Sequence, residues 1–161
     1  MGNKLRIVDN VKKATLNFLE KKFNVAFGQD IPVDPPDFGI LEFNCIQCNS
    51  IQKIDIIHHK YKSRTTIKYI KSESILNDLL IKNKLYPDYF EDGKLFGLLI
   101  NKKNPYSISS LLYNKCKFCN SKYLTFYNIE GDFPSAKTSI YYIWKIEVDE
   151  EYFLKFFHER L

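Results

Sequence analysis

The sequence has no long hydrophobic run. None of its apolar stretches approaches the length of about 20 residues that a membrane-spanning helix needs. The opening residues, Met-Gly-Asn-Lys-Leu-Arg, contain no apolar segment of the signal-peptide type, and Arg6 stands where a myristoylation site has serine or threonine. We therefore expect a cytoplasmic protein with no membrane partner. In that reducing compartment, paired cysteines favour a metal over a disulfide.

The sequence also lacks the local motifs of the common enzyme classes. It has no Walker loop, dinucleotide-binding fingerprint, nucleophile elbow or H-E-x-x-H motif. His58 and His59 are adjacent, so on a strand their side chains would point to opposite faces, and His158 has no partner motif. Asp34 and Asp37 fall in a proline-bearing loop, where aspartate commonly forms turns. We expect a protein that is not an enzyme and has no catalytic residues.

Arginine is scarce: lysine outnumbers it 21 to 3, and the formal net charge is +5. Basic residues gather around two segments and include Lys53, Lys102, Lys103, Lys115, Lys117 and Lys122. They could bind phosphates, or they could offset the net charge of about −2 on a zinc ion with four thiolates. The shortage of arginine counts against base reading, because specific contacts to guanine depend on the arginine fork.

Four cysteines in two matched motifs are the most informative feature. C-I-Q-C-N-S begins at residue 45 and C-K-F-C-N-S at residue 116, and no cysteine lies elsewhere in the sequence. We predict one structural Zn²⁺ bound by Cys45, Cys48, Cys116 and Cys119, because four soft thiolates suit tetrahedral zinc. Iron in a rubredoxin-like site has the same donors. A redox dithiol is a further alternative, although it needs only one such motif.

The asparagine that follows each C-x-x-C pair also fits a metal knuckle. The chain turns sharply there, and a residue in that position usually needs a positive φ, which asparagine tolerates better than other non-glycine residues. The two motifs resemble the zinc-ribbon and zinc-knuckle class. That resemblance implies that the four cysteines are the ligands and that each C-x-x-C lies at the tip of a β-hairpin. The chain departs from the class in having asparagine for the usual glycine and 67 residues between the knuckles.

The hydrophobic pattern predicts an α+β fold in a single domain over residues 1–161. Residues 9–23, 74–85 and 151–161 have helical spacing or capping signals, which predicts N-terminal, central and C-terminal helices. Apolar and β-branched runs predict strands of a mainly antiparallel sheet at 39–44, 51–57, 65–70, 94–100, 108–113, 123–129 and 139–148. Each knuckle thus lies between two expected strands, and the zinc clasp joins distant parts of the chain.

Two function hypotheses follow. The first is a protein-binding module with one protein partner, in its most concrete form a bacterial immunity protein that neutralises a cognate toxin. Its candidate contacts are the C-terminal acids, which could face a basic surface, and the one tryptophan, which could anchor a partner: Glu147, Asp149, Glu150, Glu151 and Trp144. The alternative is a nucleic-acid-binding zinc-ribbon protein that uses the lysines around the knuckles on phosphate.

Overall fold

The computed structural model describes residues 5–18, 21–31, 39–56, 64–67, 81–82, 84, 86–89, 95–99, 110–130, 137–149 and 157–160. Within these residues the structure has thirteen strands. They are β1 (Leu5–Asn10), β2 (Thr15–Phe18), β3 (Lys21–Asn24), β4 (Asp30–Ile31), β5 (Gly39–Asn44), β6 (Ile51–Asp55), β7 (Arg64–Ile67), β8 (Tyr86–Tyr89), β9 (Leu95–Leu99), β10 (Ser110–Lys115), β11 (Lys122–Glu130), β12 (Lys137–Val148) and β13 (Phe157–Arg160).

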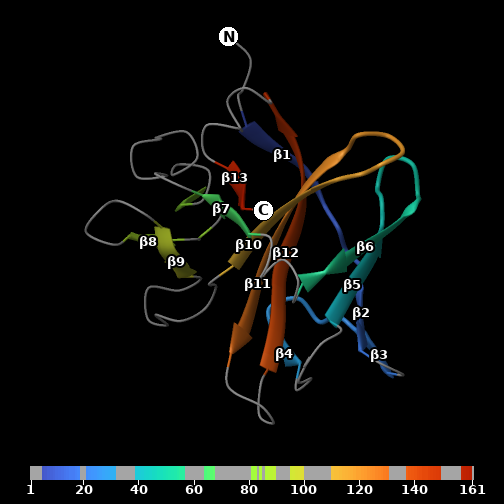
Figure 1. Cartoon of the computed structure of the whole chain (residues 1–161), viewed down its shortest axis with the longest axis horizontal. Helices are drawn as coiled ribbons and strands as arrows, with labels where there is room; N and C mark the ends of the chain where they lie inside the picture. Colours follow the sequence, from blue (N-terminus) through green and yellow to red (C-terminus); the bar gives the residue numbers. More distant parts are fainter. Residues whose placement is uncertain are drawn as a thin grey trace.

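Two antiparallel sheets form the two layers of the fold (Figure 1). In the first sheet the order is β1-β12-β11-β10, and the short β4 pairs with one end of β12. In the second sheet the order is β3-β2-β5-β6. The β5–β6 hairpin of the second sheet and the β10–β11 hairpin of the first each carry one cysteine motif at their turn. The strands predicted on both sides of each knuckle are confirmed.

The predicted α+β class is wrong, because the described residues form strands and no complete helix. Within residues 9–23, expected as a helix, the described residues form the end of β1, a crossing segment (residues 11–14), β2 and most of β3, which pairs with β2, and residues 19 and 20 lie outside the described residues. Their apolar residues suit either a helix face or short strands. Pairing of β2 with the distant β5 selects the strand, and the local pattern contains no sign of that pairing.

The other two expected helices are described only in part. Within the C-terminal one, residues 157–160 are β13, which pairs with β7, while residues 151–156 lie outside the described residues. Within the central one, Ile81 and Lys82 are helical, and residues 74–80 lie outside the described residues. Lys84 has a φ of 62°, and its N–H donates to the carbonyl of Ile81 at 2.9 Å, which closes a turn immediately before β8.

The main core lies between the two sheets. Leu16 and Leu41 from the second sheet are fully buried, and Ile140 and Ile143 from the first sheet meet them. Burial of one such side chain stabilises the fold by about 1.5–3 kcal/mol relative to exposure. The cysteines Cys45 and Cys116 belong to the same cluster, so the metal-binding motifs are continuous with the core.

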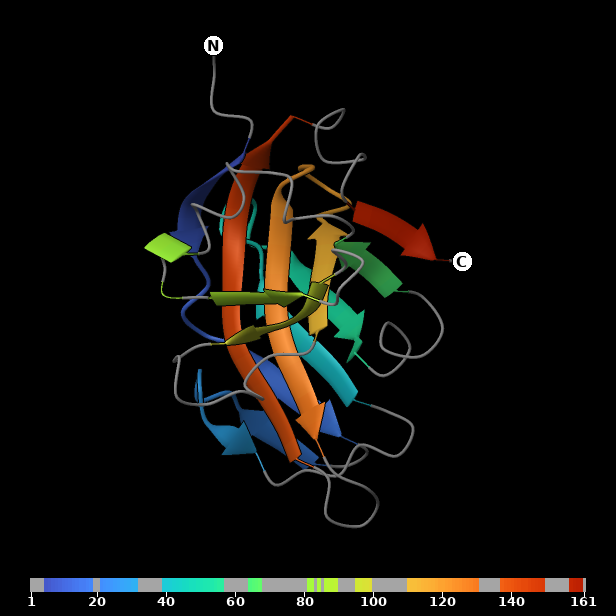
Figure 2. The same ribbon diagram turned by 90° about the vertical axis from the view of Figure 1, so that its left-hand side faces the viewer.

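The first sheet is also buried on its other face. There Trp144 packs against Phe126, with ring centroids 4.5 Å apart, and against Tyr142 at 5.5 Å. The β8–β9 hairpin crosses this sheet on the side away from the second sheet (olive in Figure 2). Trp144 is therefore a core residue, only 2% exposed, and is not available as a surface anchor.

Candidate metal centre

Both knuckles adopt the same backbone conformation. In the first, the N–H of Cys45 donates to the carbonyl of Ser50 at 2.8 Å, and the N–H of Asn49 donates to the carbonyl of Cys45 at 2.8 Å. In the second, Cys116 and Ser121 are joined in the same way at 2.8 Å, and the N–H of Asn120 donates to Cys116 at 3.0 Å. Each turn therefore brings its two thiols to one side of a hairpin tip.

The asparagine after each knuckle has the backbone conformation that the sequence predicts. Asn49 has a φ of 62° and Asn120 a φ of 63°, both in the left-handed region. A left-handed conformation costs an ordinary L-residue about 1–2 kcal/mol, and asparagine tolerates it better because its short polar side chain can hydrogen-bond locally. The backbone conformation thus explains why both motifs have asparagine at this position, and the prediction is confirmed.

The four thiols converge between the two hairpins. Their Sγ atoms all lie within 4.8 Å of one another, although the motifs are far apart in the sequence. The Sγ atoms of Cys45 and Cys119 are 3.5 Å apart, and those of Cys48 and Cys116 are 3.6 Å apart. A disulfide has an S–S distance of about 2.05 Å, so these pairs are not disulfides, and all four cysteines are free.

These distances fit the geometry of one tetrahedral metal ion. Four sulfurs at about 2.3 Å from a zinc ion stand about 3.8 Å apart along each edge of the tetrahedron. The two short S–S distances given above each join one knuckle to the other. An ion held here would therefore tie the β5–β6 hairpin of one sheet to the β10–β11 hairpin of the other. The cluster is close enough to bind one metal ion, and all-thiolate donors suit zinc and iron alike.

The serine that ends each motif contacts the thiol of the second cysteine. Ser50 Oγ lies 3.0 Å from Cys48 Sγ, and Ser121 Oγ lies 3.1 Å from Cys119 Sγ. A hydroxyl at this distance donates to a thiolate and favours the charged form that binds a metal. In the sequence this shared serine is visible only as part of the repeat, and its contact with the thiol was not predicted.

Two further residues contact the cysteines across the hairpins. The hydroxyl of Tyr123 donates to Cys45 Sγ at 3.1 Å, and Gln52 Nε2 donates to Cys116 Sγ at 3.3 Å. Each donor lies seven residues after the first cysteine of its own motif and reaches the first cysteine of the other. This reciprocal arrangement supports the two buried thiols, and the common spacing was the sequence signal that could have revealed it.

Hydrogen bonds shift the pKa of the thiols in different directions. Burial raises the pKa of Cys116, but hydrogen bonds from Ser50 and from two backbone N–H groups outweigh it and lower the pKa to about 6. Burial likewise opposes the lowering of the Cys45 pKa, which follows from the hydrogen bond from Tyr123 and from nearby backbone N–H groups. Both thiols therefore favour the thiolate.

The pKa of two other groups is raised. Hydrogen bonds from Ser121 lower the pKa of Cys119, but burial and the neighbouring Cys45 and Cys48 raise it by more. Burial and the hydrogen bond to Cys45 raise the pKa of Tyr123, so this phenol stays protonated and keeps donating. Thiols this close to one another compete for charge, and a divalent cation would relieve that competition.

The lysines predicted near the knuckles are distributed on both hairpins. Lys53 is exposed on β6, with its Nζ 3.8 Å from Glu42. Lys115 and Lys122 are opposite each other at the base of the second knuckle, and Lys117 is exposed on its turn. Lys102 and Lys103 lie outside the described residues, as do His58, His59, Asp34 and Asp37.

The predicted acidic contacts do not form one described surface. Glu147 is exposed and accepts a hydrogen bond from Arg6 Nε at 2.8 Å within the first sheet. Asp149 is exposed just beyond the end of β12. Glu150 and Glu151 lie outside the described residues. His158 is in β13, opposite Thr66 of β7 and away from the cysteine cluster in sequence and in sheet.

Comparison with protein-family models, with curated proteins and with solved structures gave no match. The described residues include no helix of the length and apolar character that crossing a membrane requires.

Proposed function

We propose that this chain is a non-catalytic protein-binding module whose two sheets are joined by a structural zinc ion on Cys45, Cys48, Cys116 and Cys119. The observation that supports it is the convergence of the four thiols, at tetrahedral spacing, on hairpins from different sheets. Four thiolates form a closed shell with no position left for water or substrate, so the metal has a structural role. This is also the role that zinc has in the zinc-ribbon class.

Exposed apolar side chains around the knuckles support a binding role for this end of the molecule. Phe118, on the turn of the second knuckle, is 79% exposed. Ile51, which follows the first knuckle, is 60% exposed, and Ile46, within it, is 39% exposed. A metal-fixed turn holds such side chains without further ordering, which lowers the entropic cost of binding. A toxin neutralised by an immunity protein is one kind of partner that such a surface could take.

A metal analysis tests the zinc centre. Protein purified without added metal should contain about one zinc per chain, as a site with four thiolates requires. Cys48→Ser should lower both the zinc content and the stability, because metal binding and folding are coupled. Ser107→Ala, a substitution outside both motifs, is the control for any loss of zinc that comes from expressing and purifying a variant. A stable, metal-free wild type would contradict the proposal.

A pull-down from the native host tests the binding role. With the full chain as bait and nuclease added, we expect one stoichiometric protein partner, which Phe118→Ser should weaken while leaving the zinc content unchanged. A toxin-like partner encoded next to this chain would support the immunity version. A wild-type chain that retains no protein would contradict the binding-module proposal.

A nucleic-acid-binding function is the second candidate. Phe118 is exposed beside Lys117, and an aromatic ring next to an ammonium group suits a stacked base and its phosphate. This candidate would be favoured if nuclease treatment removed the proteins captured in the pull-down. It would also be favoured by an affinity for single-stranded nucleic acid that falls steeply with salt. Absence of affinity at low salt would exclude it.

A further inference from the structure

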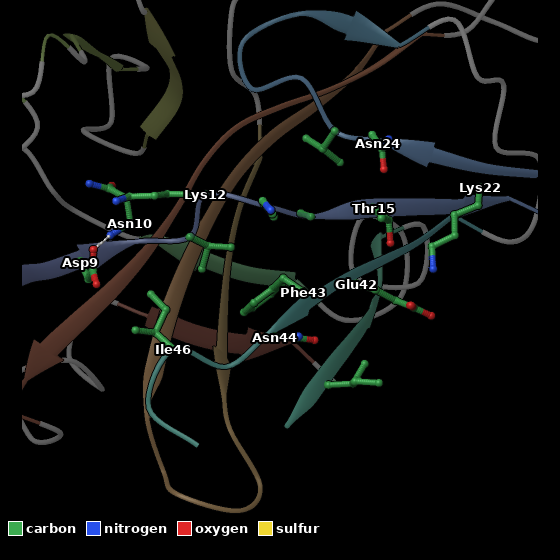
Figure 3. Close-up of a pocket in the computed structure, with 15 residues that line it drawn as sticks. Asp9, Asn10, Lys12, Thr15, Lys22, Asn24, Glu42, Phe43, Asn44 and Ile46 are labelled. Carbon is green, nitrogen blue, oxygen red and sulfur yellow. Dashed lines mark hydrogen bonds between the residues drawn. The ribbon is translucent and has the colours of Figure 1, made fainter. Parts of the chain in front are cut away.

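A pocket of about 870 Å³ opens beside the first knuckle (Figure 3). One wall is the segment that leads from β1 to β2, and the others come from β3 and from the knuckle ends of β5 and β6. The segment is fixed to both sheets, because Val11 N–H donates to the carbonyl of Ile143 and Ala14 accepts from Val25 N–H, each at 2.9 Å. The pocket therefore has a rigid wall.

Three lysines give this pocket a surplus of positive charge. Lys12 and Lys13 come from the crossing segment, and Lys22 comes from β3. All three are exposed, and none of their ammonium groups has an ion pair or hydrogen bond within the described residues. Lys12 and Lys22 lie at opposite ends of the pocket (Figure 3). Two acids, Asp9 and Glu42, also line it, and Lys53 lies 3.8 Å from Glu42.

Beneath these charges the pocket has an apolar side. Ile46 and Ile51 line it from the first knuckle and leave 39% and 60% of their surface exposed. Asn24 and Asn44 add amide groups that can donate and accept hydrogen bonds, as a peptide main chain requires. Charged, amide and apolar groups thus converge on one pocket, which is the combination found at specific binding sites.

We propose that this pocket binds an acidic segment of a protein partner. Carboxylates of that segment lie beside Lys12, Lys13 and Lys22, and one of its apolar side chains packs against Ile46 and Ile51. The proposal rests on the proposed function and adds to it the place and the chemistry of the partner. Complementary charge selects the partner and speeds its arrival, while the apolar contact supplies affinity.

The pocket suits an acidic peptide better than a nucleic acid. Asp9 and Glu42 in its walls offset part of the lysine charge, so the small surplus suits a short segment with a few carboxylates better than a backbone with a charge at every phosphate. Among the described residues that line it, Phe43 is the one aromatic, and it is only 3% exposed, so these residues present no ring for base stacking. An extended peptide can instead place its carboxylates at the lysines and keep its amides near the two asparagines.

An array of random short peptides, probed with the zinc-loaded full chain, tests this proposal. We expect the selected peptides to be enriched in aspartate and glutamate together with one leucine, isoleucine or phenylalanine. The double variant Lys12→Glu with Lys22→Glu should bind them about tenfold more weakly. The matched control is Lys82→Glu with Lys84→Glu, which makes the same charge change at two exposed lysines that do not line the pocket and should bind as the wild type does.

A second pair of variants tests the apolar contact. Ile51→Ser should weaken the selected peptides about tenfold, whereas Val8→Ser, at another exposed apolar position on β1, should not. Selected peptides without acidic enrichment, or equal losses in variant and control, would overturn the proposal. Single-stranded oligonucleotides that bind tightly and are lost on Lys12→Glu with Lys22→Glu would also overturn it, in favour of a nucleic acid.

The pull-down separates this proposal from the proposed function. If the double lysine variant still captures the partner that the wild type captures, the pocket is not the contact and the binding-module proposal stands. If the wild type captures no protein, the binding-module proposal fails first.

Discussion

Removal of one hydroxyl group from Tyr123 tests how the metal centre is supported. The phenol oxygen donates to Cys45 Sγ at 3.1 Å and accepts from the N–H of Ile46 at 2.9 Å. Tyr123→Phe deletes both hydrogen bonds and keeps the ring, whose edge packs on Phe43 with centroids 5.1 Å apart. Since no ring volume is lost, the effect reports the hydroxyl and not a cavity.

The expected loss follows from those two bonds. A hydrogen bond to a charged group contributes about 1.5–3 kcal/mol, and a buried N–H left without a partner costs about 1–3 kcal/mol. Ile46 is 39% exposed, so water can replace part of the second bond. We therefore expect Tyr123→Phe to lower the free energy of unfolding of the zinc-loaded protein by about 2–4 kcal/mol. Zinc affinity should fall about tenfold or more, as when other outer-shell partners are removed.

Urea unfolding with zinc present, and competition with a chromogenic chelator, measure the two quantities. Tyr142→Phe is the matched control, because this tyrosine is half-buried on the other face of the first sheet and its hydroxyl has no hydrogen bond within the described residues. The control should lose less than about 0.5 kcal/mol. If both variants unfold alike and hold zinc alike, the Tyr123 hydroxyl does not support the metal centre.

Other substitutions test the knuckle backbone and the core. Asn49→Ala should lower the free energy of unfolding by about 1–2 kcal/mol because the φ of 62° strains alanine, whereas Asn49→Gly should not. Chemical denaturation of both variants measures this difference, and equal losses of stability would contradict the backbone explanation. Thr125→Val should raise the melting temperature, because Thr125 Oγ1 is buried and has no hydrogen-bond partner within the described residues. A free energy of unfolding that falls by more than about 1 kcal/mol would instead point to a hydrogen-bond partner for that hydroxyl. Leu41→Ala should cost about 3–5 kcal/mol in calorimetry because its side chain is fully buried between the sheets, and a loss below about 1 kcal/mol would place Leu41 outside the core.

The strands that flank the knuckles were predictable because their sequence alternates strongly. Along β5, Gly39, Leu41 and Phe43 are buried while their neighbours are less so. The segment 9–23 was predicted wrongly as a helix, and there the local pattern is ambiguous. Val11, Ala14 and Leu16 are all buried, but they face the core from a crossing segment and a short strand. The deciding contact is with β5, a partner that local periodicity does not reveal.

The ligands were predictable and most of their supporting residues were not. Two C-x-x-C motifs point to the four thiols without knowledge of the fold, and the asparagines follow from the turn. Gln52 and Tyr123 act through contacts across two hairpins, so their role depends on how the sheets pack. Trp144 was misjudged for a related reason, since a strand buried on both faces leaves no surface for its tryptophan.

The two hairpins are equivalent over more than their knuckles. Equivalent positions of the two hairpins are 71 residues apart, and several of them are buried in both. Leu41 and Leu112 are the buried pair that precedes the knuckles, and Ile56 and Tyr127 are the buried pair that follows them. The equivalent residues also meet, because the Tyr127 hydroxyl donates to the carbonyl of Ile56 at 3.4 Å. A metal ion between two such hairpins takes two ligands from each. A substitution that destabilises one hairpin therefore also weakens metal binding by the thiolates of the other.

Gln52→Leu should therefore act in the same direction as Tyr123→Phe. It removes the donor to Cys116 at 3.3 Å and the bond from Gln52 Nε2 to Ser50 Oγ at 3.0 Å, while a similar side-chain volume stays in place. We expect zinc affinity to fall about tenfold. Gln47→Leu is the control, because Gln47 is exposed on the same knuckle and its side chain bonds only Lys145 among the contacts described. If Gln52→Leu holds zinc as tightly as Gln47→Leu, Gln52 does not support the Cys116 thiol, and the support of the two buried thiols is not reciprocal.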